Sequence, residues 1–202
     1  INFNNIILKN NKIDFYNLKK GTLHYSPKHY TYPEELHLIT FLLNDYNKEK
    51  EEECLNEKLS MNKLNDFIND MVDYAKIIKK YFNYIYNDTN EPMLKHKQYI
   101  KNFYSKYINK SYKDIITDLL KYRYKWDYYM ITVDYTIICL NILEKNSDTL
   151  LDKNNPVILI INFFLELFIH NLNPDPYKRL RKSQIQKLLE IIFKNKLKPF
   201  NI

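Results

Sequence analysis

Long stretches of this sequence repeat apolar side chains at the spacing of an α-helix, and this periodicity constrains the fold more than any other feature. Residues 60–87 show it most clearly. Their apolar positions are Leu64, Phe67, Ile68, Met71, Val72, Ala75, Ile78, Phe82 and Ile85. This spacing places apolar side chains on one helical face, where they can be buried. The chain is therefore predicted to be mostly α-helical.

The same pattern, with its stop signals, predicts further helices along the chain. They cover residues 34–46, 93–109, 111–124, 126–145, 157–171 and 176–196. Ser60 and Ser111 are suitable N-terminal caps for the helices that they precede. Residues 126–145 are almost all apolar, which is typical of a helix buried on every side.

The N-terminal segment shows a different pattern. Residues 5–8 (NIIL) and 12–15 (KIDF) are short apolar runs separated by a turn rich in asparagine. Two such runs around a short polar turn predict a β-hairpin. The predicted fold is mostly α with a small hairpin at the N-terminus.

Composition limits the cellular setting and the partners. Cys54 and Cys139 lie far apart without metal-site spacing, so they are predicted to be free thiols in a reducing, intracellular compartment. The longest apolar run, residues 156–169, contains Asn162 and Glu166 and is too short to span a bilayer, so no transmembrane segment is predicted. The net charge of +7 permits weak attraction to nucleic acid.

Residues 173–180 (NPDPYKRL) concentrate rigid and polar residues between two predicted helices. Asp175 can cap the following helix, and Pro176 suits its first position. Arg179 then lies one turn inside that helix. Glu34, at the start of an earlier helix, is favoured there by the helix dipole. Local reasoning alone places Arg179 and Glu34 each near a capped helix start, with its charge at the surface.

Asn5 and Asp14 lie at the facing ends of the predicted hairpin. An amide oxygen and a carboxylate in that arrangement can share a hard cation such as Mg²⁺, which prefers oxygen ligands. The local alternative is a polar turn without a ligand.

The order of these polar groups resembles a known family. Asn5 is followed by Asp14-Phe15, then by Tyr32-Pro33-Glu34, and finally by the segment 173–179 that ends in Arg179. This order resembles the C-terminal lobe of eukaryotic-type serine/threonine protein kinases, and it is similar to divergent kinases of large DNA viruses. Asn5 matches the catalytic-loop asparagine, Asp14-Phe15 the start of the DFG motif, and Glu34 the glutamate of the APE motif.

The resemblance implies roles for these residues. Asp14 and Asn5 would hold Mg²⁺ against the phosphates of ATP, and Glu34 and Arg179 would form a structural ion pair. The segment 16–32 would be the activation segment, where a protein substrate docks. Its candidate phosphorylation sites are Thr22, Ser26 and Thr31.

The sequence also departs from the family. Tyr16 replaces the glycine of the DFG motif, and Asn2 stands where the family has a catalytic-loop lysine. The catalytic aspartate would fall just before Ile1, and the N-terminal lobe that binds ATP would lie further upstream. No catalytic residue is thus expected within this chain, which by itself is not expected to be active. It is either part of a longer kinase or a pseudokinase.

The resemblance also divides the chain. Residues 1–39 would form the catalytic and activation segment and 124–202 the C-lobe helices, with 40–123 as a large helical insertion in one structural domain. The family's buried-helix acid would be Asp134 or Asp127.

Three functions follow as expectations. The first is a kinase that transfers the γ-phosphate of ATP to protein hydroxyls, in the host cytoplasm or the virion if the source is viral. The second is an inactive kinase-derived scaffold that binds assembly partners through 40–123. The third is a basic helical module in which the Lys- and Tyr-rich stretch 95–113 contacts nucleic acid. The nearby His24, His29 and His37 are too few for a zinc site.

Overall fold

The computed structural model describes most of the chain. The described residues are 6–9, 12–15, 32–44, 50–74, 76–86, 90–145 and 156–192. The two strands are β1 (Ile6–Lys9) and β2 (Lys12–Phe15). The α-helices are α1 (Glu34–Leu42), α2 (Glu51–Asn56), α3 (Met61–Tyr74), α4 (Lys76–Tyr86), α5 (Asn90–Tyr104), α6 (Tyr112–Leu120), α7 (Trp126–Lys145), α8 (Pro156–Asn171) and α9 (Lys182–Ile192). Short 3₁₀ turns occupy Ser105–Tyr107 and Arg123–Lys125. The protein is mostly α-helical, as the periodicity predicts.

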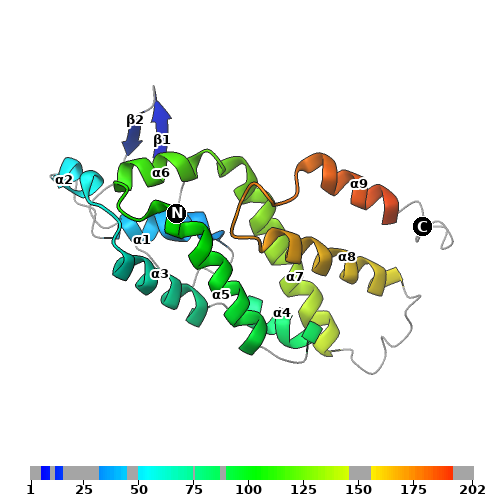
Figure 1. The fold of residues 1–202 in the computed structure, drawn as a ribbon. Coiled ribbons are helices and arrows are strands. Elements are labelled where there is room, and N and C mark those ends of the chain that lie inside the picture. The colour runs from blue at the N-terminus through cyan, green and yellow to red at the C-terminus, as the bar shows by residue number, and fades with distance from the viewer. Residues whose placement is uncertain are drawn as a thin grey trace.

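The two strands pair antiparallel at one edge of the molecule (Figure 1). Their register places Ile6 opposite Phe15 and Ile7 opposite Asp14. This pairing fixes the backbone of Asp14 in the middle of the ladder.

The helices bury two apolar clusters. The first joins α1, α3, α5 and α6 and includes Leu36, Phe67 and Ile115, which have no exposed surface. The second joins α4, α7 and α8 around Tyr81 and Phe168. In Figure 1 the two groups of helices lie side by side, with α5 running along both. The functional site described below lies where α1, α5 and the start of α7 meet.

Local signals fix several helix starts. The Ser60 hydroxyl accepts a hydrogen bond from the backbone N–H of Lys63 at 3.1 Å, and the Ser111 hydroxyl accepts one from Asp114 at 3.2 Å. Both serines therefore cap their helices as predicted. Asn109 adopts a positive φ of 64°, which asparagine tolerates better than most residues.

Several predicted helix boundaries differ from the structure. Helix α1 ends at Leu42 instead of residue 46, α5 spans Asn90–Tyr104 instead of 93–109, and α6 ends at Leu120 instead of residue 124. The span 60–87 holds two helices, α3 and α4, instead of one. The last helix begins at Lys182 instead of at residue 176, so Arg179 lies in the loop before α9. The Arg181 backbone N–H donates to the Gln184 side chain at 2.8 Å, which places the cap of α9 at Arg181. The physical reason for the late start lies in the functional site.

Helix α7 has the predicted bounds, but it is not buried on every side. Val133 and Leu140 are buried between α4 and α8, whereas Ile131 and Ile138 are 52% and 53% exposed. The sequence does not reveal which face of α7 is buried, because apolar residues lie on its solvent face as well.

Residues 40–123 contribute most of the first apolar cluster. Leu64, Phe67 and Leu119 from this span pack in the same cluster as Leu36 and Leu38 of α1. The span predicted as an insertion therefore supplies the core that supports α1. Among the described residues, no helix is both long and apolar enough to cross a membrane.

Candidate functional site

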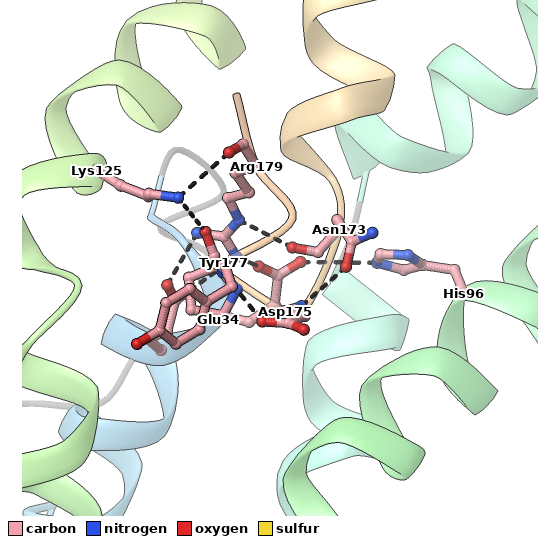
Figure 2. A network of polar contacts seen from close by, with 9 residues as sticks. Glu34, His96, Lys125, Asn173, Asp175, Tyr177 and Arg179 are labelled. Atoms are coloured by element: carbon pink, nitrogen blue, oxygen red, sulfur yellow. Dashed lines mark hydrogen bonds and ion pairs between the residues drawn. The ribbon is translucent and has the colours of Figure 1, made fainter. Parts of the chain in front are cut away.

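Arg179 is the most completely enclosed cation of the site, with 2% of its surface exposed. Its two terminal nitrogens donate to the Glu35 carboxylate at 2.9 and 2.8 Å, and one of them also donates to Glu34 at 2.8 Å (Figure 2). Its Nε donates to the backbone carbonyl of Asn173 at 2.9 Å. The structure thus brings together Arg179 and Glu34, which sequence analysis paired, and adds Glu35 as the bidentate partner.

The two glutamates reach Arg179 because α1 starts beside it. Glu34 and Glu35 are the first residues of α1 and are 1% and 0% exposed. The carbonyl of Pro33 accepts hydrogen bonds from Leu36 and His37, which begins the helix without a side-chain cap. Carboxylates in a first helical turn are favoured by the helix dipole, so the helix start and Arg179 stabilise the same negative charge.

The loop that carries Arg179 is held by its own polar side chains. The Asn173 side-chain oxygen accepts a hydrogen bond from the N–H of Asp175 at 3.0 Å, and the Asp175 carboxylate accepts one from the N–H of Tyr177 at 3.0 Å. Asp175 therefore caps a turn within the loop instead of a helix. Such side-chain bonds to the backbone two residues on are characteristic of Asn and Asp in turns.

Lys125 explains why no helix forms at residue 176. Its ammonium, 4% exposed as a residue, donates to the carbonyls of Pro176 at 2.5 Å and Arg179 at 3.2 Å. In a helix those carbonyls would accept N–H groups four residues further on. Lys125 binds both carbonyls from outside the loop and so stabilises the loop that runs up to Lys182. Sequence reasoning missed Lys125, since nothing near it signals a partner more than 50 positions away.

His96 approaches the same cluster from α5, on the side opposite Lys125 (Figure 2). It is 5% exposed, and its Nε2 lies 3.8 Å from Oε1 of Glu34, an electrostatic contact too long for a hydrogen bond. Sequence reasoning missed His96 as well. Its spacing from Met93 and Ile100 places it on the buried face of α5, and this signal was present in the sequence.

Protonation in the cluster follows from burial. Burial raises the pKa of Glu34 to about 7, against the attraction of Arg179 and with added repulsion from Glu35. Burial and then the charge of Arg179 lower the pKa of His96 to about 4. Near neutral pH, His96 is therefore uncharged and Glu34 is divided between its neutral and charged forms. Burial is the main cause for both groups, and for Glu34 it outweighs the attraction of Arg179.

Aromatic rings complete the enclosure. The Arg179 guanidinium carbon lies 4.9 Å from the ring centre of Tyr129 on α7, a cation–π distance. Tyr104 on α5 is fully buried, and its pKa is raised well above the ordinary value by burial and by the charges of Glu35 and Glu34. The cluster is thus shielded by α5 and α7, and its direct role is to join the loop before α9 to the start of α1.

Asp127 and Asp134 are the two candidates for the acid of the family's buried helix. Both aspartates are exposed on α7. They lie on the same solvent face of α7 as Ile131 and Ile138. In the order Asp127, Ile131, Asp134 and Ile138 these residues are four, three and four positions apart, and this spacing keeps them on one side of a helix. The buried ionisable residue near the start of α7 is Lys125.

The remaining predicted site residues have limited description. Asp14 is described by its backbone in β2 alone. The others lie outside the described residues: Asn5, Thr22, Ser26 and Thr31. Within the part of the chain that the structure describes, no group of three or more His, Cys, Asp or Glu residues is arranged to hold a metal ion.

The Lys- and Tyr-rich stretch 95–113 does not present its aromatic rings to solvent as a set. Tyr104, Tyr107 and Tyr112 are fully buried in the first apolar cluster, whereas Tyr99 is 61% exposed. Base stacking requires accessible rings. Tyr104, Tyr107 and Tyr112 thus serve the core.

Comparison of the chain with models of known protein families, with curated proteins and with solved structures gives no match.

Proposed function

We propose that this chain forms the C-terminal lobe of a divergent serine/threonine protein kinase, which transfers the γ-phosphate of ATP to protein hydroxyls. The observation that supports the proposal is the buried contact between Arg179 and Glu34, which spans 145 positions of sequence. The resemblance to kinases requires this contact. An interpretation of either residue as a helix cap or a surface charge does not require it. The resemblance makes no prediction for the other residues of the cluster, such as Glu35 and His96.

In the proposed kinase, the ion cluster acts on the activation segment 16–32, which lies just before Glu34. Arg179 holds Glu34 and Glu35 against the helical body, so the C-terminal end of that segment is anchored. A fixed anchor gives the peptide-docking residues a defined position, and positioning is the main contribution that a protein makes to phosphoryl transfer. Asp14 and Asn5 offer the carboxylate and amide oxygens that suit Mg²⁺.

A second candidate is a kinase-derived scaffold without catalytic activity. The exposure of both Asp127 and Asp134 favours it, because the resemblance places this acid in a buried helix, whereas the face of α7 that carries both aspartates is open to solvent. The ion cluster would then have a structural role alone. Helices of the span 40–123 would offer the binding surface to partner proteins.

One assay distinguishes the two candidates. The natural polypeptide that carries this sequence is incubated with Mg²⁺, γ-labelled ATP and a general protein substrate. Wild type is expected to transfer label and Asp14→Asn to lose transfer by at least about a hundredfold, the size expected when a positioned charge contact in the transition state is removed. Asp66→Asn, on the exposed face of α3, is the matched control and keeps wild-type transfer.

Absence of transfer by folded wild type would contradict the kinase proposal and support the scaffold. Equal transfer by wild type and Asp14→Asn would contradict the role given to Asp14. Circular dichroism of each variant establishes that loss of transfer is not loss of folding.

A further inference from the structure

A cavity of about 1070 Å³ opens beside the ion cluster. Its walls are α5, the ends of α4 and α8, and the loop 173–178. This volume is at the upper end of the range of small-molecule sites in proteins. Neither Glu34 nor Arg179 lines it, so the cavity is distinct from the centre of the ion cluster.

One side of the cavity is aromatic and apolar. Phe82 and Leu172 are buried in its wall, and Phe103 is partly buried there. Tyr86 and Tyr99 are 56% and 61% exposed on the same cavity. Exposed rings above a buried apolar wall suit a flat apolar group, which gains both burial and ring contacts.

The other side carries charges, and most of them compensate one another. Glu91 and Lys95 form an ion pair at 2.6 Å. The Asp175 carboxylate accepts the N–H of Tyr177 and is also attracted by Lys106, which lies near it. Of the two lysines in the lining, Lys95 is paired with Glu91, and Lys178 is the cation left to meet a ligand.

The ammonium of Lys178 has no ion pair or hydrogen bond among the described residues. Two side-chain amides add donors to the same lining. The oxygen of Asn102 is engaged by Gln98 at 2.8 Å, and that of Asn173 by the N–H of Asp175 at 3.0 Å. Because these oxygens are occupied, the amide N–H groups are the parts left for a ligand, and they favour an acceptor.

We propose that this cavity binds a small anion with a flat apolar group, held by Lys178 and the two amides on one side and by the aromatic wall on the other. Charge-assisted hydrogen bonds fix the anionic end, and burial of the flat group supplies the remaining affinity. The inference does not depend on the kinase proposal.

His96 connects the cavity to the ion cluster, because it lines the cavity and also faces Glu34 at 3.8 Å. An anion in the cavity stabilises a positive charge on His96. Ligand binding is therefore accompanied by proton uptake just above pH 4, the pKa of His96 without ligand. The charged and titratable groups around His96 and the cavity are Glu34, Glu35, Tyr86, Glu91, Lys95, Tyr99, Asp175, Lys178 and Arg179.

Calorimetric titration with benzenesulfonate tests the site, because the charge of this anion does not change with pH. Saturable binding is expected for wild type, and affinity about tenfold lower is expected for Lys178→Ala, the size of one hydrogen bond to a charged group. Lys113→Ala, an exposed lysine on α6 away from the cavity, is the matched control and binds as wild type does. Sulfate and benzyl alcohol, which each carry half of the required chemistry, bind more weakly.

Absence of saturable binding, or equal affinity of wild type and Lys178→Ala, would overturn the proposal. The link to His96 has its own readout: titrations at about pH 5, between the His96 pKa of about 4 and the ordinary value of 6.5, in two buffers of different protonation enthalpy give the number of protons taken up. Wild type takes up protons, and His96→Gln binds without uptake. If the substitution prevents folding, the His96 ring proton is titrated by NMR in wild type with and without the anion. An unchanged titration midpoint would overturn the link.

Discussion

Arg179 carries one positive charge into an interior where two carboxyl groups face it. Glu35 makes two hydrogen bonds to the guanidinium and Glu34 makes one. The geometry therefore assigns the ionic partnership mainly to Glu35, and burial leaves Glu34 with a pKa of about 7. These adjacent residues of one helical turn thus differ in how they bind Arg179.

This difference predicts unequal effects of two identical substitutions. Glu35→Gln leaves Arg179 without its bidentate partner and is expected to lower the free energy of unfolding by about 3–5 kcal/mol. Glu34→Gln removes one hydrogen bond from a group that is partly neutral and is expected to cost about 1 kcal/mol. Urea unfolding at pH 7, followed by circular dichroism, measures both. Equal costs would contradict the assignment.

Glu34 and His96 also give opposite dependences of stability on pH. The pKa of Glu34 is raised from 4.5 to about 7, so its contribution is fully present below pH 4.5 and is lost as pH rises through 7. The pKa of His96 is lowered from 6.5 to about 4, so its contribution is present above pH 6.5 and is lost as pH falls through 4. Between pH 4.5 and 6.5 the two slopes oppose each other.

Removing one of these two groups should leave the pH dependence of stability that the other group causes. Relative to wild type, His96→Gln is expected to lose stability as pH rises from 4.5 to 7, and Glu34→Gln as pH falls from 6.5 to 4. Urea unfolding of the three proteins across this range measures the difference. Parallel curves for all three would show that neither pKa is shifted as described.

At the scale of elements, the structure divides α7 into a buried face and a solvent face. Leu140 is 1% exposed and Ile138 is 53% exposed, although both belong to one apolar run. Leu140→Ala is expected to destabilise the protein by about 2–5 kcal/mol, because it leaves a cavity. Ile138→Ala should change stability by no more than about 0.5 kcal/mol. Thermal and urea unfolding of the two variants test the division, and similar losses would contradict it.

The sequence was informative where a signal and its consequence are local. The serine caps at Ser60 and Ser111 and the bounds of α7 follow from neighbouring residues, and these predictions are confirmed. The start of α9 was wrong because Asp175 and Pro176 form a plausible helix cap locally. The competing partner, Lys125, lies 51 positions from Pro176 and has no local signature.

The candidate site shows the same limit. The pairing of Arg179 with Glu34 was anticipated from a family resemblance, whereas helical periodicity alone would have left both at the surface. His96 was detectable from its spacing on α5, but its neighbour Glu34 was not. Exposure of Asp127 and Asp134 could not be read from a helix whose two faces are both largely apolar.

At the scale of the whole molecule, the ion cluster links parts of the chain that the apolar clusters hold separately. Glu34 and Glu35 belong to α1 in the first cluster, and Arg179 follows α8, which belongs to the second. Lys125 and His96 attach α7 and α5 to the same point. The central claim is therefore that one buried guanidinium couples the C-terminal loop to the start of α1.

A double-mutant cycle between Arg179 and Glu35 tests this claim most directly. Unfolding free energies at pH 7 are measured for wild type, Arg179→Met, Glu35→Gln and the double variant, with Arg181→Met as the exposed arginine control. Direct contact predicts that the double variant loses less stability than the sum of the single losses, with a coupling energy of about 0.5–3 kcal/mol, and that Arg181→Met costs little. Single losses that add to within about 0.3 kcal/mol would contradict the account, because such additivity is the behaviour of residues that do not touch.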